Sequence, residues 1–118
     1  MVLVDTSVWV AHFREGNDRL GAALDKGEVL SHPFIVGELA CGNLKNRREI
    51  LDLLQTLPRA AAVSDEEAMR FIELRRLAGI GLGYIDVHLL ASAVITGAPL
   101  WTLDRTLSRT AARLNVAY

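Results

Sequence analysis

The chain has 118 residues, 51% of them hydrophobic, which suits a single domain, 1–118, that buries roughly two thirds of its unfolded surface and excludes a second domain. The formal net charge of −1 excludes a protein that holds nucleic acid by overall basicity, so any nucleic-acid contact would have to be local. One cysteine, no pattern of a secretion signal and no uncharged stretch of membrane-spanning length together predict a soluble, cytoplasmic protein.

In chain order, short apolar runs of strand length alternate with longer segments of helical spacing. The predicted strands are 2–4, 29–30, 60–63 and 100–103. The predicted helices are 7–14, 18–26, 33–43, 47–54, 65–78, 86–96 and 105–113. Cys41 lies among apolar residues near the end of its helix, which predicts a buried thiol. The alternation indicates an α/β fold with a parallel sheet that helices cover on both faces.

The glycine-rich stretch GIGLG, 79–83, follows a segment of helical spacing. A dinucleotide-binding loop needs a strand directly before its glycines, so this stretch is interpreted as a helix cap and loop. Just upstream, Ser64 and Glu67 have the spacing of a capping box, which assigns the acids of 65–67 to structure.

Three acids lie at positions where a sheet of this kind binds ligands. Asp5 and Asp104 directly follow predicted strands, and ligands of open α/β sheets bind beyond the carboxyl ends of strands. Asp86 starts helix 86–96, on the face predicted to pack inward. Each acid alone has a structural alternative, because a carboxylate at the start of a helix is a good cap worth ~1 kcal/mol.

A fourth acid, Glu38, lies in mid-helix one turn from Phe34 and Cys41, which predicts that it projects from the apolar stripe. With the other three it would place four carboxylates at one end of the sheet, without an evident lysine or arginine among them. A divalent cation would neutralise such a group, and hard oxygen ligands favour Mg²⁺ or Mn²⁺ over zinc. All-carboxylate metal sites perform phosphoryl transfer.

Four stretches, LVDTSVW, GELACG, DVHLLASA and LWTLDR, resemble in order and spacing the motifs of the PIN-domain ribonucleases, in particular the VapC-type toxins of toxin–antitoxin pairs. The resemblance implies a three-layer PIN-like fold with a short parallel sheet of four to five strands. It further implies an acidic pocket that binds Mg²⁺ or Mn²⁺, endonuclease cleavage of RNA, a homodimer, and inhibition by a small VapB-like antitoxin whose C-terminal segment enters the active-site groove. Many relatives carry a further acid where this chain has Thr106, so that possible ligand of a second metal ion is missing.

Under the hypothesis of a metal-dependent ribonuclease, each of the four acids has a role in binding metal or in orienting water. Asp5, Asp86 and Asp104 bind the metal ion directly or through water, whereas Glu38 binds a second ion or orients the attacking water. Thr6 is preferred to Ser7 as a substrate contact, although either hydroxyl would serve equally as a helix cap.

Basic and aromatic residues have less specific interpretations. Arg105 and Arg109 share one face of the last helix with Arg113 and are candidate contacts to RNA phosphates, with a solvated helix face as the alternative. Thr102 is interpreted as a strand residue, and the dispersed histidines, His12, His32 and His88, are interpreted as structural.

Two other functions stay open at this point. A metal-dependent phosphatase with an aspartyl nucleophile would use the acid after the first strand, but it usually has a second acid two positions later, where this chain has Ser7. A catalytically silent binding module would keep the fold and use its acids as caps.

Overall fold

A short parallel sheet lies at the centre of the molecule. The computed structural model describes all residues, 1–118. The central strand β1 (Val2–Val4) pairs in parallel with β2 (Val29–Leu30) on one side and β3 (Leu100–Trp101) on the other, in the order β2-β1-β3. Every residue of these strands is buried. Because Val2 is in register with Val29 and Leu3 with Leu100, the carboxyl ends of all three strands lie at one edge.

The prediction of a strand at 60–63, and with it a sheet of four to five strands, is wrong. Arg59 forms only an isolated parallel bridge with Ser31, and the Ala60 amide donates to the Ser31 carbonyl (2.9 Å). The next amide, that of Ala61, donates to the Thr96 hydroxyl instead of to a strand (2.9 Å). Alanine offers little apolar surface to bury at a sheet edge, so the chain leaves the sheet after one bridge.

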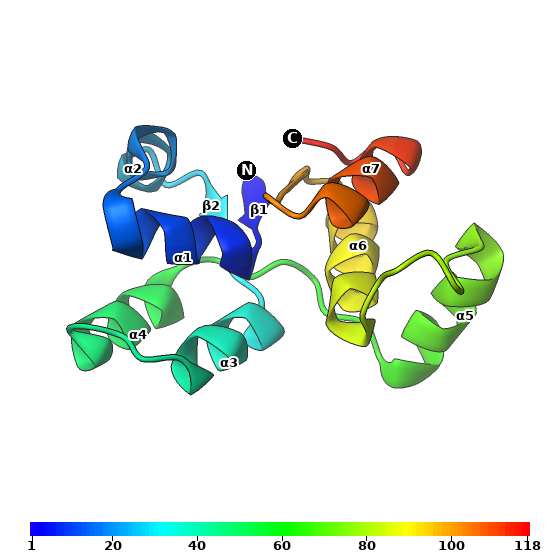
Figure 1. Cartoon of the computed structure of the whole chain (residues 1–118), viewed down its shortest axis with the longest axis horizontal. Helices are drawn as coiled ribbons and strands as arrows, with labels where there is room; N and C mark the ends of the chain where they lie inside the picture. The colour runs from blue at the N-terminus through cyan, green and yellow to red at the C-terminus, as the bar shows by residue number, and fades with distance from the viewer.

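All seven predicted helices are present, and their ends lie within three residues of the predicted ones. They are α1 (Thr6–Glu15), α2 (Asp18–Asp25), α3 (Pro33–Cys41), α4 (Arg47–Thr56), α5 (Asp65–Arg75), α6 (Tyr84–Thr96) and α7 (Arg105–Arg113). Helices α1 to α4 lie on one side of the strands and α6 and α7 on the other, with α5 outermost beyond α6 (Figure 1). None of these helices is long and apolar enough to cross a membrane.

Helix α6 is the most deeply buried helix. All residues from Val87 to Ala93 are buried, so the helix is covered on every side, as expected of a helix in the middle of a core. The preceding loop contains Gly79 and Gly81 at positive φ (74° and 95°), which confirms that the glycine-rich stretch is a loop after a helix. The capping box of Ser64 and Glu67 is also confirmed.

Helix α3 ends with an exposed cysteine. Its buried residues are Ile35 and Leu39, one turn apart, and Cys41 lies off this stripe with an exposed side chain. The prediction of a buried thiol is therefore wrong, because apolar neighbours in sequence do not put a residue on the apolar face of a helix.

The start of α3 is fixed by a buried histidine. His32 Nδ1 accepts a hydrogen bond from the Phe34 amide (3.0 Å), and its Nε2 lies 3.1 Å from Ser92 Oγ on α6. Burial, followed by the positive charges of His88 and Arg59, lowers the pKa of His32 from 6.5 to about 4. His32 is thus a neutral ring in the folded protein.

This lowered pKa predicts a loss of stability in mild acid. Between pH 6.5 and pH 4 the unfolded chain binds a proton at His32 that the folded protein does not, so the free energy of unfolding falls as the pH falls through this window. The expected loss from pH 7 to pH 5 is about 2 kcal/mol. Urea unfolding of wild type and His32→Asn at both pH values measures it. Other acids titrate in the same range, so an equal loss in both proteins would contradict the prediction.

Candidate active site

Asp5 lies at the carboxyl end of the central strand, where it is only 8% exposed. It occupies the N-cap position of α1, yet its side chain makes no capping hydrogen bond. Instead, Asp5 Oδ2 accepts hydrogen bonds from Ser7 Oγ and Thr102 Oγ1, both at 2.7 Å. The capping alternative is therefore wrong for Asp5, whose other oxygen, Oδ1, has no hydrogen bond within the protein.

Thr102 belongs to this site, and its interpretation as an ordinary strand residue is wrong. It follows the end of β3, donates to Asp5, and accepts a hydrogen bond from the Asp104 amide (3.1 Å). Ser7 Oγ accepts in turn from the Leu103 amide (3.0 Å). The two hydroxyls thus join the start of α1 to the segment that follows β3. The available signal in the sequence was a hydroxyl two residues before Asp104, the acid between β3 and α7.

Asp86 and Asp104 each cap a helix with one carboxylate oxygen. Asp104 Oδ1 accepts from the Leu107 amide (2.8 Å) at the start of α7. Asp86 Oδ2 accepts from the Gly83 amide (3.0 Å) at the start of α6, which is half of a capping box because glycine has no side chain to return the bond. The capping alternative therefore holds for both residues, but the second oxygen of each remains free.

Glu38 is exposed, so the prediction that it projects from the apolar stripe of α3 is wrong. It lies beside that stripe, next to buried Leu39, and points toward the start of α1. There the Thr6 hydroxyl donates a hydrogen bond to Glu38 Oε1 (2.7 Å). Thr6 thus connects the turn after β1 to the acid on α3.

The charges of the other three acids affect the pKa of Asp86. Partial burial raises the pKa of Asp86, and the negative charges of Asp5, Asp104 and Glu38 raise it further, against the lowering effect of the Gly83 amide. None of the four acids forms an ion pair with a basic side chain, since the one ion pair of the structure joins His88 to Asp65 (3.6 Å).

The donor set fits a hard divalent cation in its chemistry. It consists of carboxylate and hydroxyl oxygens, and one oxygen of each acid is free of hydrogen bonds within the protein. As the side chains stand, no three histidine, cysteine, aspartate or glutamate side chains form a group that could hold a metal ion. One oxygen of Asp86, Asp104 and Glu38 is held instead by a hydrogen bond within the protein.

Comparison with known proteins identifies the family. A family model of the PIN domain matches residues 2–113. Ribonuclease VapC32 of Mycobacterium tuberculosis, in strains CDC 1551 / Oshkosh and ATCC 25618 / H37Rv, is 44% identical over 118 residues, which cover 99% of this chain and 95% of the relative. The chain belongs to the PIN-domain family. Within the PIN domains it is a VapC-type protein, as its four motifs predicted. PAE2754 from Pyrobaculum aerophilum has a crystal structure similar to this PIN domain, with a TM-score of 0.64 and 19% identity over 92% of this chain and 78% of that chain, which supports the fold alone.

Two arginines of α7 lie beside Asp104 in this PIN domain. Arg105 and Arg109 line a surface depression of about 470 Å³ together with Asp104 and Thr102. Arg113 does not line this depression, and its guanidinium donates a hydrogen bond to the Arg75 carbonyl at the end of α5 (2.8 Å). Two of the three arginines are therefore free to contact a ligand near Asp104.

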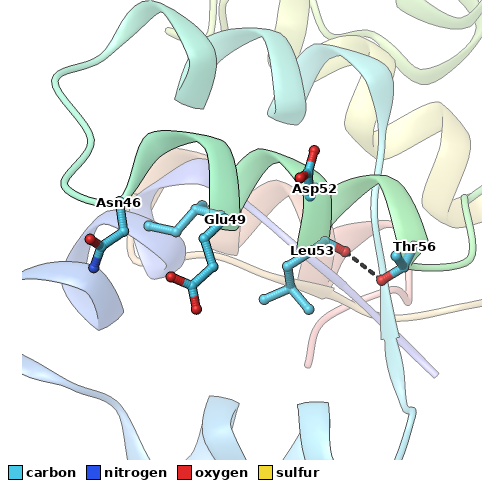
Figure 2. A pocket seen from close by; sticks show the side chains of 6 residues that line it. Asn46, Glu49, Asp52, Leu53 and Thr56 are labelled. Carbon is cyan, nitrogen blue, oxygen red and sulfur yellow. Dashed lines mark hydrogen bonds between the residues drawn. The ribbon is translucent and has the colours of Figure 1, made fainter.

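Two other hollows mark the surface of the PIN domain. A groove of about 630 Å³ runs beside Glu38 and Thr6, and the apolar side chains of Val10, Phe13 and Leu39 form part of its wall. Figure 2 shows a pocket of about 420 Å³ that contains none of the four acids. All its lining residues belong to α4 and the preceding Asn46, so it is a depression along one helix.

Proposed function

We propose that this VapC-type PIN domain is a metal-dependent endoribonuclease, a toxin that hydrolyses RNA phosphodiester bonds at Asp5, Glu38, Asp86 and Asp104. The observation that carries the proposal is the set of four acids, each with one oxygen free of hydrogen bonds within the protein and none in an ion pair. In agreement with this, partial burial raises the pKa of Asp86, and the charges of Asp5, Asp104 and Glu38 raise it further. A protein keeps such an uncompensated group at a cost in stability, which a bound cation would remove.

The ion proposed is Mg²⁺ or Mn²⁺, held through the free oxygens of Asp5, Asp86 and Asp104. When bound, it would activate water and stabilise the charge that develops on the phosphate and on the leaving oxygen. Ser7 and Thr102 keep Asp5 Oδ2 occupied, so that Oδ1 faces the site in one orientation. Thr6 orients Glu38, which in this proposal positions the attacking water or binds a second ion.

RNA is proposed to enter along the depression beside α7. Arg105 and Arg109 line it next to Asp104, and arginine contacts to the phosphate backbone supply affinity that does not depend on sequence. Thr6 is a further candidate contact to a phosphate oxygen on the side of Glu38.

The proposed partner is a small VapB-like antitoxin. The groove beside Glu38 has apolar walls formed by Val10 and Phe13, and it also contains Arg14 and Lys45. An antitoxin segment with apolar side chains that lies in this groove would reach Glu38 and block the site. We further propose that residues 1–118 act as a single nuclease domain, as a homodimer, in the cytoplasm.

The decisive experiment is RNA cleavage by the protein purified without antitoxin. We expect mixed RNA to be cut with Mg²⁺ or Mn²⁺, to stay intact in excess chelator, and to be cut again when Mn²⁺ is restored. Expression in a host should arrest growth, and co-expression of the antitoxin should relieve the arrest. Cleavage that persists in chelator would reject the metal site, and intact RNA under every condition would favour a silent binding module.

A further inference from the structure

We propose that His32 is a positioning residue of the active site, which holds the helix that carries Glu38 in place against the helix that carries Asp86. The inference rests on the proposed function, since it assigns His32 a task only if these acids act together. His32 itself touches none of the four acids. One ring nitrogen contacts the start of α3, and the other contacts α6.

The hydrogen bonds of His32 determine the state of its ring. Nδ1 accepts from the Phe34 amide (3.0 Å), so this nitrogen carries no proton. In the neutral ring the proton is therefore on Nε2, which donates to Ser92 Oγ (3.1 Å). His32 and Ser92 are 1% and 0% exposed, so water does not replace either partner.

This contact lies at a short distance along each helix from one of the acids. Glu38 lies six residues after His32, and Asp86 lies six residues before Ser92. Six residues of α-helix span ~9 Å, less than two turns, over which a helix is stiff. A shift of α3 against α6 at this contact would therefore displace Glu38 relative to Asp86. The Phe34 ring also packs edge to face with the His88 ring of α6 (4.8 Å between centroids), so an apolar contact lies beside the directional hydrogen bond between the two helices.

The alternative is that His32 only stabilises the fold, and the chain offers a matched control for it. His12 Nδ1 also accepts a hydrogen bond from a backbone amide, that of Asn17, at the same 3.0 Å. That bond joins α1 to the start of α2, which carries none of the four acids. His12→Asn therefore removes a comparable side chain without a link between two acids.

Two variants break the contact from opposite sides. Ser92→Ala removes the acceptor of Nε2 and keeps the cap on α3. His32→Asn keeps an acceptor for the Phe34 amide, since asparagine is a favoured N-cap, but its side chain is too short to reach Ser92. Both should lower kcat for RNA cleavage about 10-fold, because a small misplacement of a reacting group by a distant mutation costs up to ~100-fold, with KM for RNA within about twofold of wild type. The double variant should be no worse than the single ones, because each removes the same bond.

The experiment has a second readout that does not depend on turnover. Calorimetric titration of each folded variant with Mn²⁺ should show an affinity reduced at least about threefold for Ser92→Ala and His32→Asn and unchanged for His12→Asn. If the two variants melt earlier but keep the kcat and Mn²⁺ affinity of wild type, the role of His32 is structural and the inference is overturned. A wild-type protein that neither cleaves RNA nor binds Mn²⁺ would overturn the proposed function, and the inference with it.

Discussion

Replacement of Asp5 by asparagine is expected to lower kcat/KM for RNA cleavage more than about 100-fold, the upper range for loss of a residue that merely supports a metal ligand. Asparagine can still accept hydrogen bonds from Ser7 and Thr102 through its carbonyl oxygen, so the local structure should persist. It then places an uncharged NH₂ group where Asp5 presents its free oxygen. The loss of one charge and one ligand atom should therefore remove activity without unfolding the protein.

Single-turnover cleavage of a defined RNA, at saturating Mn²⁺, measures this effect. Asp52→Asn is the matched control, because Asp52 is exposed on α4 and lines the pocket of Figure 2, which contains none of the four acids. The control should cleave at the wild-type rate. Wild-type cleavage by Asp5→Asn, in a preparation free of contaminating nuclease, would contradict the assignment of Asp5 to the site.

Replacement of Asp86 by asparagine is expected to stabilise the metal-free protein and to destabilise it relative to wild type once Mn²⁺ is present. The folded-state pKa of Asp86 is raised above its unfolded value. In the window between these values the folded protein binds more protons than the unfolded chain, so stability falls as the pH rises through it. At pH 7 the ionised side chain therefore costs stability, and asparagine removes the cost while its oxygen still caps Gly83.

The expected gain without metal is about 2–5 °C in Tm at pH 7, and it should vanish below pH 3.8, where the unfolded carboxyl is also protonated. Saturation with Mn²⁺ to 100 times Kd would add about 2.7 kcal/mol to wild type but little to the variant, which reverses their order. Differential scanning calorimetry in chelator and in Mn²⁺ tests both halves. If Asp86→Asn melts below wild type in chelator, repulsion among the acids is not the dominant effect at this position.

Periodicity predicted the helices well because each helix needs a continuous stripe of apolar residues. This stripe can be read from the local sequence without knowledge of distant contacts. The same signal failed at 60–63, where four apolar residues of small volume form no strand and the only bridge is that of the preceding Arg59. It also failed for Cys41 and Glu38, since the buried stripe of α3 is narrow and consists of Ile35 and Leu39.

The sequence predicted those residues of the candidate site that follow the ends of strands. Asp5 and Asp104 follow buried strands, and their neighbourhood comes from the parallel register of β1 and β3. The supporting residues were not predictable in this way. Thr102 acts on Asp5 across 97 positions and His32 on Ser92 across 60, and nothing local in the sequence specifies such pairs.

The different anchoring of the acids bears on how relatives of this protein should be compared. Asp86 and Asp104 each close the first turn of a helix, so a descendant that had lost catalysis would still gain from keeping them. Asp5 caps nothing, and in a dead enzyme its buried charge would be only a burden. In relatives, an aspartate at the position of Asp5 is therefore the better indicator of nuclease activity. Its replacement should be among the first substitutions after catalysis is lost.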